Sequence, residues 1–221
     1  MHALSARADD LFAPSMLQLV DDAEGGIRYW PRLLDADTAA AWFERLRANA
    51  PWTSMQRPMY DRVVDVPRLL AGYALAALPE NLPLAELLAR VQAVVPAPYT
   101  HVGMNLYRDG RDSVAMHHDK LPTLAVGQPI TLVSLGAHRR MLIRARGGRR
   151  ETIAIDLAPG SLLSMSHASQ STHEHGIPKT RREQPARISA VFRARTVRPS
   201  TQANGASRSC SMAPDPEDTG R

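Results

Sequence analysis

Short strand-like runs dominate the chain after residue 98 and constrain its fold more than any other feature. Each run has six or seven residues, and turn-forming pairs such as Asp109-Gly110 and Pro159-Gly160 separate neighbouring runs. Strands at this spacing predict a sandwich, a jelly roll or a barrel. The seven runs are HVGMNLY (101–107), SVAMHHD (113–119), ITLVSLG (130–136), RMLIRAR (140–146), ETIAIDL (151–157), SLLSMS (161–166) and RISAVFR (187–193).

Two helical patterns precede these strands. The first covers residues 35–52, with Asp35 or Asp37 as the N-cap and apolar residues recurring every three or four positions. The second covers residues 81–96, where Pro83 occupies a position tolerated in a first turn and Pro96 ends the helix. The sequence therefore predicts helices before residue 98 and strands after it.

A chain of 221 residues suits one domain with a tail. We predict an N-terminal extension at residues 1–25, a folded domain at 26–196 and a disordered tail at 197–221. The tail is assigned because it contains almost no large apolar residues.

Membrane insertion and secretion are not indicated. No run approaches the ~18 apolar residues that a membrane span needs, and the first residues lack the apolar stretch of a signal peptide. The lone cysteine, Cys210, cannot form an internal disulfide, which agrees with a reducing compartment. We expect a cytoplasmic monomer without a membrane partner.

The positive charge of the chain is concentrated in its second half. The net charge is +5, and residues 139–195 contain twelve Lys and Arg against four Asp and Glu. A phosphate backbone is one partner that suits such a surface, because neutralised phosphates release counterions. A solvated basic surface is the other interpretation, and charge alone does not separate the two.

A cluster of metal-ligand residues ends the second strand-like run. On a strand His117 and Asp119 share one face, ~6.6 Å apart, while His118 points to the other face. One further ligand would complete a facial triad for iron(II), and His173 and His175 are the candidates. The alternative is a solvated strand end with no metal.

Two arginines share a face of the last strand-like run, Arg187 and Arg193. Buried guanidinium groups need partners, and they bind carboxylates in bidentate fashion. A dicarboxylic cosubstrate such as 2-oxoglutarate would supply one carboxylate for each arginine. The alternative is that both arginines pair with Asp or Glu on neighbouring strands.

Five motifs together resemble the AlkB-like family of Fe(II)- and 2-oxoglutarate-dependent dioxygenases. They are NLYRDGRDSVAMHHD, LVSLGAHRRMLIR, APGSLLSMS, HEHGIPK and RISAVFR, and the resemblance extends from about Tyr29 to Arg195. It implies an α+β, mainly β chain, with a double-stranded β-helix (jelly roll) and N-terminal helices packed on it. It also implies oxidative demethylation of alkylated DNA or RNA bases of the DNA-repair type, with O₂ as oxidant and loss of formaldehyde.

The resemblance assigns roles residue by residue. The family's iron ligands correspond to His117, Asp119 and His175. Its cosubstrate contacts correspond to Asn105, Tyr107, Arg187 and Arg193. Arg187 is expected to face the far C5 carboxylate of 2-oxoglutarate and Arg193 the C1 carboxylate beside the iron. His173 remains an alternative to His175.

The chain departs from the family in its substrate pocket. Leu121 stands where nucleic acid demethylases usually carry an acidic residue that reads the damaged base. Ser189 and Val191 replace an Asn and a Thr, which reduces the hydrogen bonding around the cosubstrate. These departures leave the metal and cosubstrate positions intact and weaken the substrate assignment.

The remaining substrate residues are predicted from residue type. Tyr73 and Tyr60 are the aromatic residues nearest to the positions that stack on a flipped base, although core packing would also explain them. Arg139, Arg140 and Arg149 are candidate phosphate contacts. Two other functions stay open: the same chemistry on a protein or small molecule, and a non-catalytic β-barrel binding module.

Overall fold

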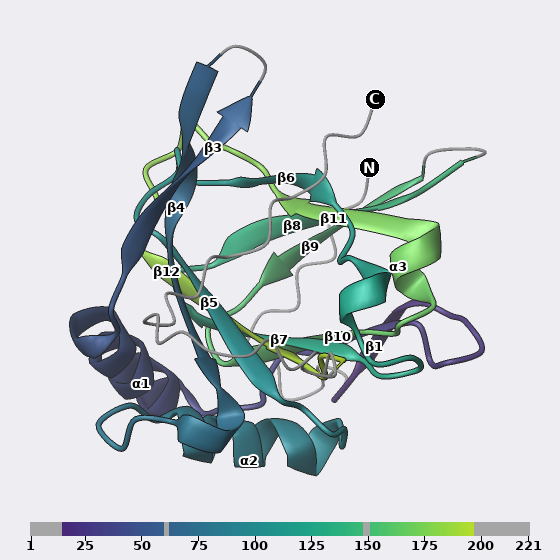
Figure 1. Ribbon diagram of the computed structural model, residues 1–221, viewed down its shortest axis with the longest axis horizontal. Helices are drawn as coiled ribbons and strands as arrows, with labels where there is room; N and C mark the ends of the chain where they lie inside the picture. Colours follow the sequence, from purple (N-terminus) through teal and green to yellow (C-terminus); the bar gives the residue numbers. More distant parts are fainter. Residues whose placement is uncertain (1–14, 60–61, 148–150, 197–221) are drawn as a thin grey trace, which may run out of the picture.

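Two β-sheets face each other in the computed structural model, which describes residues 15–59, 62–147 and 151–196 (Figure 1). The larger sheet has eight strands in the order β1-β2-β10-β7-β12-β5-β4-β3. Their bounds are β1 Leu17–Val20, β2 Ile27–Trp30, β10 Ser161–Met165, β7 Ile130–Gly136, β12 Arg187–Arg193, β5 His101–Tyr107, β4 Arg62–Ala74 and β3 Thr53–Met59. Every pairing in this sheet is antiparallel.

The smaller sheet has four antiparallel strands in the order β6-β11-β8-β9. Their bounds are β6 Val114–His117, β11 His173–Ile177, β8 Arg139–Ala145 and β9 Thr152–Leu157. Consecutive strands alternate between the two sheets, from β5 to β6, β6 to β7 and β7 to β8. This arrangement is the predicted jelly roll, and the mainly β fold class is confirmed.

Helices α1 (Ala36–Asn49) and α2 (Leu84–Val94) cover the outer face of the larger sheet (Figure 1). Asp35 is the N-cap of α1: its carboxylate accepts hydrogen bonds from the backbone N–H and the hydroxyl of Thr38, both at 2.8 Å. Leu84, Leu87 and Val91 of α2 are fully buried. The short helices are α3 (Ser169–Thr172), η1 (Leu75–Ala77) and η2 (Leu121–Thr123). No helix among the described residues is long and apolar enough to cross a membrane.

Apolar side chains form two cores on opposite faces of the larger sheet. One lies beneath the helices and includes Leu46, Leu87 and Phe192. The other lies between the two sheets and includes Ile143 and Leu163. Each strand of the larger sheet therefore presents alternate residues to the helices and to the space between the sheets.

The prediction of helices before residue 98 was incomplete, because the two predicted helices share that region with strands. Strands β1 to β4 all lie in that part of the chain. Pro67 falls inside the 13-residue strand β4, at a shift in its register with β3 between Ser54 and Gln56. Proline in a strand is confined to edges and irregular positions, so this sequence does not have the pattern of an uninterrupted strand.

The predicted terminal segments can be compared with the structure only in part. Strand β1 lies within residues 1–25, before the predicted boundary of the domain, and it pairs with β2 beyond that boundary. The tail at 197–221, together with Tyr60 and Arg149, lies outside the described residues.

Gly136 at the end of β7 packs closely against Phe43 of α1 and the backbone of Ala186. Its φ is +81°, and an added Cβ would lie 2.6 Å from both the Ala186 carbonyl oxygen and the Phe43 ring. We expect Gly136→Ala to lower the free energy of unfolding by about 3 kcal/mol, because backbone strain and overpacking add.

Gly127 is the matched control, since its φ is +71° but an added Cβ would meet nothing within 4 Å. Gly127→Ala should cost only the strain, about 1 kcal/mol. Urea denaturation measures both losses. Equal losses in the two variants would show that the contact with Phe43 and Ala186 is unimportant.

Candidate functional site

Two imidazoles meet where β6 and β11 pair in the smaller sheet. His117 and His175 are direct partners in the antiparallel register, and their ring centroids lie 4.4 Å apart. His175 is buried, and its burial together with the neighbouring His117 lowers its pKa to about 3. The ring is therefore neutral near pH 7, so a nitrogen lone pair is available to a metal ion.

Asp119 follows β6 by two residues, so it does not continue the strand that was predicted over 113–119. Its carboxylate accepts two hydrogen bonds from Arg193, one from Nε and one from Nη2, both at 2.9 Å. Burial would raise the pKa of Asp119, but Arg193 and the two imidazoles lower it to about 2. The side chain is therefore an ionised carboxylate beside His117 and His175.

Among residues 15–59, 62–147 and 151–196, no three His, Cys, Asp or Glu side chains already stand as a metal-binding group. Both oxygens of Asp119 face Arg193, and a metal would have to draw one of them away. The donor chemistry nevertheless fits iron(II), which two imidazoles and one carboxylate bind as a facial triad.

His173 lies outside this cluster. It begins β11 opposite Ala145, and its Nδ1 is 2.9 Å from the Thr172 hydroxyl. Burial lowers its pKa, and the charge that raises it belongs to Asp22. The geometry therefore favours His175 over His173 as the distal candidate ligand. His118 is exposed, as predicted for the opposite face.

Arg187 is fully buried between the sheets, and it forms no ion pair with the residues that the structure describes. Its Nε donates to the Ser134 hydroxyl at 2.9 Å, and both Nη atoms are buried without a hydrogen-bond partner among the described residues. Burial lowers the pKa of Arg187. An unpaired buried guanidinium fits a ligand carboxylate that would accept from both Nη atoms.

The two arginines of β12 therefore differ. The interpretation that both pair with Asp or Glu holds for Arg193, which binds Asp119, and fails for Arg187. Tyr107 lies beside Arg187, whose guanidinium carbon is 5.1 Å from the centre of its ring. These residues lie on the strands that border the space between the sheets.

Asn105 connects three neighbouring strands. Its Oδ1 accepts a hydrogen bond from Arg68 Nε at 2.7 Å, and its Nδ2 donates to the Ser189 hydroxyl at 3.3 Å. Arg68 is buried on β4 and also donates to the Ser113 carbonyl. The sequence interpretation missed Arg68, although a lone charge inside the apolar run VPRLL was the available signal.

Gln170 was also missed. It is 1% exposed, and its Oε1 accepts a hydrogen bond from the backbone N–H of Asp119 at 3.0 Å. Its Nε2 donates to the Ser166 carbonyl and to the Ser169 hydroxyl. A buried amide with all of these contacts fixes the backbone at Asp119. Asp119 and Gln170 are 51 positions apart in the sequence, so no short motif could have predicted their contact.

Two predicted substrate residues do not fit their roles. Tyr73 pairs with Val102, so its side chain lies on the helix-covered face of the larger sheet, and it packs against the core there. Arg139 is 3% exposed and donates to the carbonyl oxygens of Asp109, Asp112 and Pro178. Tyr73 cannot stack on a base beside the histidines, and Arg139 supports loops instead of contacting phosphate.

The other two substrate candidates remain predictions. Arg140 is exposed, with its Nε and Nη2 each 2.8 Å from the Asp156 carboxylate. Leu121 is half-buried at the start of η2, two residues after Asp119.

The family model described as the 2OG-Fe(II) oxygenase superfamily matches residues 74–198. The chain belongs to this superfamily. The cofactors of this superfamily are Fe(II) and 2-oxoglutarate, and the matched region contains the histidine pair, Asp119 and both arginines of β12.

Curated relatives belong to the AlkB branch of 2OG-Fe(II) oxygenases. DNA oxidative demethylase ALKBH2 of Bos taurus is 32% identical over 130 residues, which cover 56% of this chain and 47% of that protein. Alpha-ketoglutarate-dependent dioxygenase alkB homolog 3 of Rattus norvegicus is 28% identical over 183 residues, covering 74% of this chain and 62% of that protein. The chain thus spans about half to three fifths of these relatives.

Solved structures of 2OG-Fe(II) oxygenases share the fold. The structure of OsALKBH1 superposes with a TM-score of 0.55 at 15% identity and covers 76% of this chain and 97% of that one. A 2OG-Fe(II) oxygenase family oxidoreductase from Burkholderia pseudomallei gives a TM-score of 0.52 at 16% identity, covering 76% and 84%.

Proposed function

We propose that the protein is an Fe(II)- and 2-oxoglutarate-dependent dioxygenase that oxidatively demethylates N-alkylated bases in DNA or RNA. The observation that carries the proposal is the unpaired, fully buried guanidinium of Arg187 in the same sheet sandwich as the His117–His175 pair. Bound iron and 2-oxoglutarate supply the oxidation, in which O₂ and the cosubstrate yield succinate and CO₂ while an N-methyl group leaves as formaldehyde.

The chain's own residues hold and orient these partners. His117, Asp119 and His175 would bind the metal, and Arg187 would bind the far carboxylate of the cosubstrate. When a metal draws Asp119 away, Arg193 would be left facing the second carboxylate. Asn105, fixed by Arg68, and Tyr107, beside Arg187, would complete the cosubstrate site.

Gln170 is the positioning residue for Asp119 in this scheme, because it holds the backbone of that ligand. We expect Gln170→Met to weaken Mn(II) binding by about tenfold, the lower end of the range for partners that orient metal ligands. Isothermal titration calorimetry measures the affinity, and thermal unfolding measures stability.

The matched control is Gln92→Met on α2, where the glutamine is exposed. Gln92→Met should change neither quantity. If Gln170→Met lowers the melting temperature but leaves Mn(II) affinity unchanged, Gln170 supports the fold alone.

Nucleic acid is the proposed substrate because ALKBH2 is named a DNA oxidative demethylase. The test is formaldehyde release from oligonucleotides with 1-methyladenine or 3-methylcytosine, in DNA and in RNA, with unmethylated oligonucleotides as controls. Formaldehyde that depends on Fe(II), 2-oxoglutarate and the methyl group supports the proposal. Cosubstrate turnover without any release from these oligonucleotides contradicts the substrate.

A second candidate keeps the cofactors and assigns a protein or small-molecule substrate. Two observations favour it: Leu121 cannot accept a hydrogen bond from a base, and Tyr73 faces the helices. This candidate predicts that cosubstrate consumption is indifferent to oligonucleotides. The third function, a non-catalytic binding module, predicts that His117→Ala leaves iron affinity unchanged.

Location and assembly also belong to the proposal. We infer a cytoplasmic protein, because a lone cysteine agrees with a reducing compartment, and we propose that it is a monomer. Size-exclusion chromatography with light scattering tests the monomer, for which one mass near 24.3 kDa is expected.

A further inference from the structure

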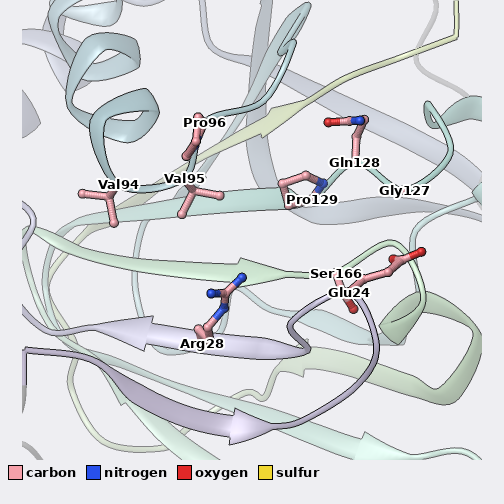
Figure 2. Close-up of a pocket in the computed structure, with 9 residues that line it drawn as sticks. All are labelled: Glu24, Arg28, Val94, Val95, Pro96, Gly127, Gln128, Pro129 and Ser166. Atoms are coloured by element: carbon pink, nitrogen blue, oxygen red, sulfur yellow. The ribbon is translucent and has the colours of Figure 1, made fainter.

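A cavity of about 290 Å³ lies away from the histidine pair (Figure 2). It lies between β2, the end of α2 and the loop before β7. Its lining residues are Glu24, Arg28, Val94, Val95, Pro96, Gly127, Gln128, Pro129 and Ser166. None of the candidate metal or cosubstrate residues contributes to this wall, so the cavity is separate from the proposed active site.

Arg28 supplies a cation to this cavity. Its Nε is buried without a hydrogen-bond partner among the described residues. Its guanidinium lies 5.8 Å from the centre of the Trp30 ring and passes over Gly25, where an added Cβ would meet Nη2 at 2.5 Å. Figure 2 shows the guanidinium directed toward the space between Val95 and Pro129. The guanidinium lies beside Trp30 and forms no ion pair with the residues that the structure describes.

The nearby carboxylates are engaged elsewhere. Asp22 accepts hydrogen bonds from the Ser166 hydroxyl at 2.6 Å and from the Gly26 N–H at 2.8 Å. Glu24 accepts one from the Ala168 N–H at 2.7 Å, and Figure 2 shows its carboxylate directed away from Arg28. No ion pair with Arg28 is formed within the described ranges. Arg28 is half-buried with only its Nε fully shielded, so its guanidinium can take an external anion from the cavity.

The rest of the wall selects the kind of anion. Val94, Val95, Pro96 and Pro129 are apolar and lie opposite Arg28 (Figure 2). We propose that the cavity binds a small organic monoanion, with its carboxylate on Arg28 and a short apolar body against the valines and prolines. This binding is distinct from the proposed dioxygenase activity and does not depend on it.

The test follows the Arg28 Nε–H signal in ¹⁵N-labelled full-length protein. Burial of Nε slows exchange with water, and absence of the signal in Arg28→Gln identifies it. The chemical shift of this signal should change on addition of sodium butyrate and reach saturation. Acetate and inorganic phosphate should bind more weakly, because neither has an apolar chain long enough to contact the valines and prolines. Arg28→Gln, assayed by calorimetry, should weaken butyrate binding by at least about tenfold.

The matched control is Arg90→Gln, because Arg90 is an exposed arginine on α2. This variant should bind butyrate as tightly as the unchanged protein. The Arg187 Nε–H signal reports the cosubstrate region independently, and 2-oxoglutarate should move that signal and not the signal of Arg28. A signal of Arg28 that does not respond to butyrate, or phosphate binding as tight as butyrate binding, would overturn the inference. So would equal butyrate affinity in Arg28→Gln when thermal unfolding shows that the variant is folded.

Discussion

His175→Ala is expected to abolish both metal binding and formaldehyde release, whereas His173→Ala should retain both. His175 pairs with His117 across the sheet, with ring centroids 4.4 Å apart, and burial keeps its ring neutral. Its loss removes one of three proposed ligands, so Mn(II) affinity should fall by more than the ~100-fold seen at most when a ligand's orienting partner is lost.

The comparison of the two variants separates a ligand from a nearby histidine. His173 lies two residues away on the same strand, and the charge that acts on it belongs to Asp22. Calorimetric titration with Mn(II) and formaldehyde release under saturating Fe(II) are the two measurements. The reverse pattern, with His173→Ala inactive and His175→Ala active, would reassign the distal ligand. Metal binding and activity retained equally in both variants would contradict a metal site between β6 and β11.

Arg187→Met should stabilise the protein without cosubstrate and remove its response to 2-oxoglutarate. The arginine is 0% exposed, and neither of its Nη atoms has a hydrogen-bond partner in the part of the chain that the structure describes. Methionine therefore replaces a buried charge that has no ion pair there with an apolar chain. We expect the free energy of unfolding to rise by about 1–3 kcal/mol. The KM for 2-oxoglutarate should rise about 100-fold or more, as for other truncated partners of buried charge pairs.

Arg140→Met is the control for this change. Its guanidinium is exposed and paired with Asp156, and exposed ion pairs contribute about 1 kcal/mol or less. Urea denaturation with and without 2-oxoglutarate measures the stability of both variants and its response to the cosubstrate. Cosubstrate turnover measures the KM of both variants. A destabilised Arg187→Met variant with an unchanged KM would show that Arg187 serves the fold and not the cosubstrate.

Alternation and turn residues were sufficient to predict the strands after residue 98, apart from β11. Strands β5, β7, β8, β9, β10 and β12 lie close to the predicted runs. Strands β1 and β2 have four residues each, which is too short for a period to be recognised, and Pro67 obscured β4. The helices α1 and α2 were predictable from their apolar spacing, from the Asp35 cap of α1 and from the prolines on either side of α2.

The sequence was sufficient to select the candidate residues of the site, but it revealed only part of how they lie relative to one another. Which side chain lies opposite His117 depends on strand register, and a one-residue slip would have placed another residue there. The face occupied by Tyr73 likewise follows from its pairing with Val102, which the sequence does not reveal. Arg139 shows the limit of charge counting, because its carbonyl partners lie up to 39 residues away.

The central claim is that His117, Asp119 and His175 hold one metal beside a 2-oxoglutarate bound by Arg187. A crystal structure of the protein soaked with Mn(II) and 2-oxoglutarate tests this most directly. We expect one Mn(II) in contact with all three side chains and the far carboxylate of the cosubstrate on the Nη atoms of Arg187. Manganese at His173, or a cosubstrate that leaves Arg187 unpaired, would contradict it.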